Sequence, residues 1–315
     1  MQLKAKLLLL GAACAALIAA YLWIDLGAEW RYALERRTLK VLAVLLTGSS
    51  VAFATVVFQT ITHNRILTPS IIGMDSLYNL IQTSVVFFFG ATNALWVNEK
   101  VHFAVSAGLM ILFAGLLYRA LFRREKFNLY FVILVGLIMG VFFQSFASFM
   151  EMLIDPNEFL VAQGRMFGSF NNVRTGLLAV AFAASGLVAL YFYPAASYLD
   201  VLALGRDHAI SLGVNYVAVV RRLWVAISGL VAISTALVGP VTFLGLLVAN
   251  LAYELLKTHR HAVLIPGAML VSVALLTAAL IAVERVFAFN TTVSVIVNFA
   301  GSFYFIYVVL KESQA

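Results

Sequence analysis

The side chains that perform covalent chemistry in other proteins are scattered along this sequence and form no catalytic group. Cys14 is the single cysteine, so the chain has no internal disulfide and no cysteine pair for zinc. No His-Glu-x-x-His or Gly-x-Ser-x-Gly motif occurs. His259 and His261 flank Arg260 without carboxylate or thiol neighbours, and we interpret them as interfacial anchors rather than metal ligands. The sequence therefore predicts that the chain is not an enzyme and has no metal site.

The sequence also contains no motif for binding a nucleotide phosphate and no clear site for a coupling ion. The sequence has no Gly-x-x-x-x-Gly-Lys-Ser/Thr loop, so we expect it to bind neither ATP nor any other cofactor. Asp75, Glu151 and Glu284 lie near the ends of apolar segments, where capping or snorkelling explains them. An ion-coupled secondary transporter should hold a charged site within the membrane. The lack of a clear mid-membrane acid counts against that function, which is kept as an alternative.

The elements that position these residues are apolar segments long enough to cross a membrane. Hydrophobic residues make up 63% of the 315 residues and charged residues 11%, whereas soluble domains carry about 25% charge. A spanning helix needs roughly 20 mainly apolar residues. The sequence therefore predicts an all-α polytopic membrane protein, a single domain over residues 1–315 with about ten transmembrane helices. The expected spans are residues 7–27, 40–62, 71–91, 102–119, 128–149, 174–194, 219–238, 241–256, 262–283 and 292–310.

Three connections between these spans exceed a simple turn, at residues 28–39, 150–173 and 195–218. The spans 219–238 and 241–256 meet at Gly239-Pro240 with almost no loop, so a tight re-entry or a broken helix is expected there.

The distribution of basic residues predicts the orientation. With both termini in the cytoplasm, most of the 21 lysines and arginines fall on inner segments, as the positive-inside rule requires. The basic cluster at residues 119–126 is the strongest inner anchor, whereas the cluster at residues 31–40 falls outside and breaks the rule. We attribute the net charge of +7 to contact with anionic membrane lipid, because no basic stripe typical of nucleic-acid binding occurs.

The inner segment 195–218 has the features of an element that receives motion from a separate ATPase. A short amphipathic helix bounded by glycines suits that role, with Gly213 at a left-handed end position. Ala209 keeps one face small, so that another chain can approach. The alternative is an ordinary interfacial helix between spans. The candidate coupling residues are Leu204, Gly205, Arg206, Asp207, His208, Ala209, Leu212 and Gly213.

This coupling segment resembles that of the FecCD-type permeases, the ten-helix subunits of type II ABC importers for ferric siderophores, haem and vitamin B12. Further blocks agree in the same order and extend the resemblance over nearly the whole chain. The departures, such as Arg65 in place of a proline, suggest a divergent branch similar to permeases for catecholate siderophores. The matching blocks are residues 37–48, 64–73, 166–169, 202–214, 239–246 and 301–305.

The resemblance implies the transmembrane subunit of an ATP-driven importer for an iron–siderophore-type chelate in a bacterial cell membrane. A second copy or a paralogue would complete the translocation pathway at a two-subunit interface. ATP and Mg²⁺ would bind to a separate ATPase subunit, and an extracytoplasmic substrate-binding protein would deliver the chelate. A zinc or manganese ABC permease is the nearest alternative.

The resemblance also assigns roles to individual residues. Arg37 and Lys40, with Arg285, match basic positions that receive acidic residues of the binding protein; lipid anchoring is the alternative. In the span 128–149, Gly136 and Gly140 form a face that permits close approach of another helix. Gln144, Ser145 and Ser148 on that span are candidates to line the pathway, with ordinary bundle packing as the alternative.

Overall fold

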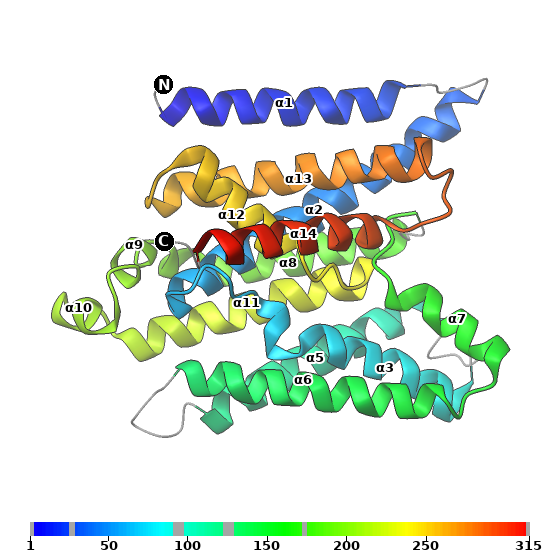
Figure 1. Cartoon of the computed structure of the whole chain (residues 1–315), viewed down its shortest axis with the longest axis horizontal. Helices are drawn as coiled ribbons and strands as arrows, with labels where there is room; N and C mark the ends of the chain where they lie inside the picture. Colours follow the sequence, from blue (N-terminus) through cyan, green and yellow to red (C-terminus); the bar gives the residue numbers. More distant parts are fainter. Residues whose placement is uncertain (1–2, 25–28, 91–97, 122–128, 172–174, 313–315) are drawn as a thin grey trace.

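The computed structural model describes residues 3–24, 29–90, 98–121, 129–171 and 175–312 (Figure 1). Within these residues the regular elements are all helical, as predicted. Each of the ten expected spans corresponds to one helix. These helices are α1 (Leu3–Trp23), α2 (Trp30–Thr62), α3 (Met74–Phe89), α5 (Glu99–Leu121), α6 (Leu129–Glu151), α8 (Thr175–Ala196), α11 (Tyr216–Val238), α12 (Leu244–Leu256), α13 (His261–Arg285) and α14 (Val293–Glu312). Four short elements join them, namely η1 (Pro69–Ile72), α7 (Pro156–Met166), α9 (Leu199–Leu202) and α10 (Arg206–Ser211).

Seven of the described helices are long and apolar enough to cross a membrane. The helices α3 and α12, with 16 and 13 residues, reach only about 24 and 20 Å, less than the hydrocarbon thickness of about 30 Å. Both begin inside the bundle instead of at its surface. The multi-pass architecture is therefore confirmed, but three of the ten predicted spans are not among the seven: α3 and α12 are partial, and α14 is a shorter apolar helix over Val293–Tyr307.

Helix α2 begins earlier than predicted. Residues 30–39 were expected in a connection, yet they form the first turns of this helix, which is 33 residues long. The stretch is too polar for an apolar span, but leucine, alanine, arginine and glutamate favour helix regardless of solvent. The predicted basic cluster at residues 119–126 lies mostly outside the described residues.

The helices α2, α11 and α13 form the centre of the bundle. In their apolar windows 78%, 67% and 56% of residues are buried, compared with 11% in α1, which packs on α13 at the periphery. Trp224 of α11 is fully buried and donates a hydrogen bond to the carbonyl oxygen of Ala114 on α5, at 3.1 Å. The axes run roughly along the long dimension of the molecule, with α1 and α6 on opposite sides (Figure 1).

Two helix breaks lie inside the bundle. Between α11 and α12 the chain leaves helical geometry at Gly239, whose φ is +98°. The predicted break at Gly239-Pro240 is therefore confirmed. Gly168 packs directly against this break, and the Ser169 amide donates to the carbonyl oxygen of Val238 at 2.9 Å.

The second break lies at the junction of η1 with α3, whereas the loop at residues 63–67, between α2 and η1, is exposed or partly exposed. Gly73 joins the two elements with φ +85°, and a Cβ atom there would lie 2.8 Å from the Cα of Gly140. The glycine face of α6 thus permits the close approach that was predicted, but the approaching element is the turn at η1 rather than a helix. Asp75 follows in the first turn of α3. The predicted position near a helix end is correct, but neither capping nor snorkelling explains this residue, because no side chain caps α3 and the Asp75 Oδ2 atom is buried.

The contact between α6 and η1 predicts the effect of adding one methyl group. A Cβ atom at Gly136 would lie 2.9 Å from the Cα of Ile72, so Gly136→Ala should destabilise the fold by about 1–3 kcal/mol. Gly115→Ala in α5 is the matched control, because no atom lies within 4 Å of its Cβ position. Thermal unfolding of the purified chain in detergent measures both. Equal unfolding temperatures for the two variants would contradict the packing described here.

Candidate functional site

The coupling segment forms α9 and α10 at one end of the bundle, seen on the left in Figure 1. Gly205 precedes α10 with φ +104° and Gly213 follows it with φ +82°, conformations that side chains with a Cβ atom rarely adopt. The left-handed end position predicted for Gly213 is therefore confirmed. The Val214 amide donates to the carbonyl oxygen of Ala209 at 3.0 Å and closes the helix end.

The surface of α10 differs from the one expected. Ala209 is fully buried within the chain's own core, so its small side chain lets α10 pack on the bundle instead of leaving room for another chain. The side chains that point away are Leu204, Ile210 and Leu212, which are 59%, 48% and 63% exposed. Arg206, Asp207 and His208 are also exposed. An exposed apolar patch bordered by charges is typical of a protein interface.

A hydrogen-bonded chain ties this segment to the bundle. Asp200 of α9 accepts from the backbone amide of His261 at 2.9 Å and from its Nδ1 at 2.6 Å. The His261 Nε2 lies 2.7 Å from the Thr60 hydroxyl of α2. Burial raises the pKa of Asp200, but the hydrogen bonds from His261 outweigh it and hold the pKa below its usual value. The interpretation of His261 as an interfacial anchor is wrong, since the residue is buried and links α9 to α13 and α2.

The three predicted docking residues come together at the opposite end of the bundle. Arg37 donates from Nη1 to the carbonyl oxygens of Tyr21 and Leu22 at the end of α1. It also donates to that of Ile24, just after the helix, at 2.6 Å, and Arg285 donates to the same Ile24 oxygen at 2.9 Å. Lys40 and Glu284 form an ion pair at 2.7 Å, and Glu284 also accepts from the Tyr21 hydroxyl at 2.7 Å. We call this group the α1 clamp; its members are Tyr21, Arg37, Lys40, Glu284 and Arg285.

The α1 clamp gives these basic residues a role within the chain. The carbonyl oxygens at a helix end lack intrahelical partners, and here the two guanidinium groups supply them. Arg37 and Lys40 are only partly exposed, whereas Arg285 is exposed. The exposed Arg31 and Arg36 lie nearby on α2 and keep this end of the bundle basic. Docking of a binding protein at this end stays a prediction.

The candidate pathway residues lie on the outer face of α6. Gln144, Ser145 and Ser148 are exposed, as are the apolar Phe142 and Phe146 beside them. They are not among the residues that line the polar cavity at the centre of the bundle. They can line a pathway only if a second subunit covers this face, so their assignment stays a prediction.

The sequence did not reveal that Glu284 pairs with Lys40 or that Asp200 pairs with His261. Glu284 was explained as a helix-end residue, and Asp200 received no role. Both carboxylates hold a basic residue that is distant in sequence, so no local pattern reveals the pair. Among the residues that the structure describes, no three histidine, cysteine, aspartate or glutamate side chains gather as metal ligands do.

The α1 clamp predicts a stability effect that separates it from simple lipid anchoring. Arg37→Gln removes charged hydrogen bonds to α1 and should cost about 1.5–3 kcal/mol. Arg36→Gln, one residue away on an exposed side chain that contacts Tyr32, should stay within about 0.5 kcal/mol of the wild type. Unfolding in detergent measures the difference. If both variants lost the same stability, the clamp would not hold α1.

Comparison with known proteins places this geometry in a family. The chain is 50% identical over all 315 residues to the petrobactin import system permease protein YclO of Bacillus subtilis (strain 168), and the match covers 100% of both chains. It is 36% identical over 278 residues to the petrobactin import system permease protein FatC of Bacillus anthracis, which covers 88% of this chain and 78% of that one.

The fold agrees with that of a solved structure of a metal-chelate type ABC transporter. The two share a TM-score of 0.84 at 23% identity, over 98% of this chain and 100% of the other. The sequence profile of the FecCD transport family matches residues 7–311. This chain therefore belongs to the FecCD transport family.

Proposed function

We propose that this chain is the membrane-spanning subunit of an ATP-driven importer for an iron–siderophore chelate, with petrobactin as the first candidate. The observation that carries the proposal is the 50% identity to a petrobactin import permease along the whole of both chains. A second relative at 36% identity carries the same substrate in its name. The chain itself would perform no covalent chemistry and bind no cofactor.

A separate ATPase would drive transport through the coupling segment. Three observations support this assignment. The exposed Leu204, Ile210 and Leu212 present an apolar surface beyond the ends of the spanning helices. The glycines at both ends fix the conformation of α10. The hydrogen bonds through Asp200 and His261 connect the segment to two central helices, so a force applied there can reach the bundle.

The orientation in the membrane follows from the same assignment. If the coupling segment faces the cytoplasm, the start of α1 and the end of α14 do so as well, because both lie at that end of the bundle (Figure 1). The α1 clamp then faces outward. A substrate-binding protein would dock on this basic end, with Arg285 and the neighbouring Arg36 as the accessible charges. The membrane would be the bacterial cell membrane.

The translocation pathway would form between two subunits, either two copies of this chain or this chain and a paralogue. The outer face of α6 suits such an interface because exposed polar side chains lie beside exposed phenylalanines toward its end. Gln144, Ser145 and Ser148 would then face the chelate. They would hold it loosely, because a site that binds tightly also releases slowly.

Uptake measurements test the proposal. We expect deletion of the chain to abolish uptake of ⁵⁵Fe delivered as ferric petrobactin and re-expression to restore it. Uptake of labelled vitamin B12 and of ferric hydroxamate should be unchanged. Loss of zinc or manganese uptake with normal petrobactin uptake would instead support the alternative ABC permease function, and uptake that persists without ATP would support a secondary transporter.

The exposed apolar surface of α10 predicts a selective loss of coupling. Leu212→Asp should leave the unfolding temperature unchanged, because this side chain is 63% exposed. It should weaken binding of the ATPase subunit at least about tenfold, since burying a charge in place of an apolar anchor costs more than about 1.4 kcal/mol. Leu212→Met is the matched control and should bind normally. Co-purification and ATPase titration measure both, and normal coupling in Leu212→Asp would remove this residue from the interface.

A further inference from the structure

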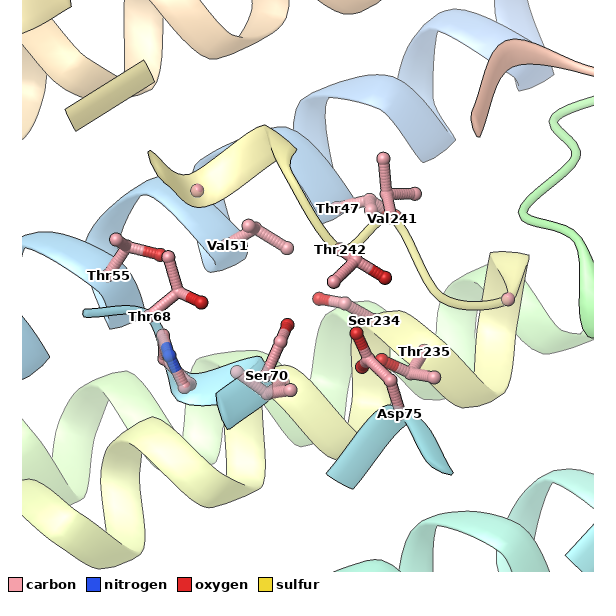
Figure 2. Close-up of a pocket in the computed structure, with 14 residues that line it drawn as sticks. Thr47, Val51, Thr55, Thr68, Ser70, Asp75, Ser234, Thr235, Val241 and Thr242 are labelled. Atoms are coloured by element: carbon pink, nitrogen blue, oxygen red, sulfur yellow. The ribbon is translucent and has the colours of Figure 1, made fainter. Parts of the chain in front are cut away.

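A small polar cavity lies at the centre of the bundle, between the two helix breaks. Its walls come from the middle of α2, from η1 and the start of α3, from the end of α11 and from the break before α12 (Figure 2). The cavity volume is about 20 Å³. A single water molecule needs roughly 10–15 Å³ by the same measure, so the cavity has room for one occupant of that size.

Asp75 places a carboxyl group in this cavity. It is the one ionisable side chain among the fourteen described residues that line the walls. The hydroxyls of Ser70 and Thr242 hydrogen-bond to the carboxyl group, but its Oδ2 atom is buried and has no hydrogen-bond partner of its own. A buried carboxylate is costly unless a positive charge or a proton compensates it. The two hydroxyls compensate the charge in part, and because no lysine, arginine or histidine is among these lining residues, a bound proton or a bound cation would supply the rest.

Several hydroxyl groups share the same space without partners in the described chain. The side-chain oxygens of Thr47, Thr55 and Ser234 are buried, each residue is 1% exposed, and none has a hydrogen-bond partner. Figure 2 shows the carboxyl group of Asp75 directed toward the same space as the hydroxyls of Ser70, Ser234 and Thr242. A proton on Asp75 would neutralise the charge but would give the Ser234 oxygen, which faces the carboxyl group, no partner. A cation between them would compensate the carboxylate and contact the Ser234 oxygen as well.

The donor set indicates the class of cation. Carboxylate and hydroxyl oxygens are hard ligands that suit hard cations, and the cavity offers one negative charge. Divalent ions of this class are bound by several carboxylates or retain a large hydration shell, for which this cavity has no room. Broken helices near the middle of a membrane protein also place polar backbone groups where a sodium ion can bind.

We propose that this cavity binds one sodium ion, held by the Asp75 carboxylate and the hydroxyl oxygens of Ser70, Ser234 and Thr242. The ion joins the start of α3 to the end of α11 and to the break before α12. It thereby fixes the two elements that begin inside the bundle. The site is separate from the coupling segment and from the α1 clamp, and it does not depend on which chelate the importer carries.

The test is the thermal stability of the full-length chain in detergent while NaCl is replaced stepwise by choline chloride at constant ionic strength. We expect the unfolding temperature of the wild type to rise with sodium and to saturate, and potassium to act more weakly because it is larger. Asp75→Asn should show no sodium response. Glu35→Gln, which removes an exposed carboxylate from α2, should respond as the wild type does.

A second variant keeps the experiment decisive if Asp75→Asn does not fold. Ser234→Ala preserves the charge and removes one hydroxyl, so it should raise the sodium concentration at half-effect several-fold. A wild type without sodium response, or an equal response in Asp75→Asn, would overturn the proposal. Asp75→Asn as stable as the sodium-saturated wild type would also overturn it and identify a protonated carboxyl group. None of these readouts involves transport, so failure of the proposed function and failure of the sodium site are distinguishable.

Discussion

Backbone polar groups inside a membrane protein must find partners within the protein, and this constraint decides how the centre of the bundle is built. The chain leaves helical geometry at two buried glycines, Gly239 and Gly73. At the break after α11, Gly168 comes close enough for the Ser169 amide to reach the carbonyl oxygen of Val238. At the start of α3, Gly73 packs on Gly140. Both contacts require glycine because the two backbones touch. A side chain at either position would push the two segments apart.

The apolar segments and their order could be predicted from the sequence because hydrophobicity alone determines which residues enter the membrane. The depth of each helix could not. Asp75 lies near the start of an apolar segment, a position that usually faces the membrane surface. The preceding turn at η1 carries that start into the bundle, and only the glycine contact with α6 shows this. The hydrophobic pattern of the sequence therefore predicts the ten helices, whereas the position of Asp75 inside the bundle depends on packing between segments that are distant in the sequence.

Some features of the candidate site could likewise be predicted from the sequence, and others could not. The helix in the coupling segment could be predicted because glycines stand at both of its ends, and the positive φ angle of Gly213 confirms the left-handed position predicted there. The role of Ala209 was reversed, since its small side chain serves packing within the chain. The pairs Lys40–Glu284 and Asp200–His261 join residues that are 244 and 61 positions apart, so their charges looked unpaired in the sequence.

Helix α2 connects all of these features. From its start to its end it carries Arg37 and Lys40 of the α1 clamp, Thr47 and Thr55 of the central cavity, and Thr60 beside His261. At 33 residues it extends about 50 Å, so it reaches from one end of the bundle to the other. The contact of α9 with His261 and the α1 clamp at the opposite end are therefore joined by one continuous helix, which carries Thr60 near its end and Arg37 near its start.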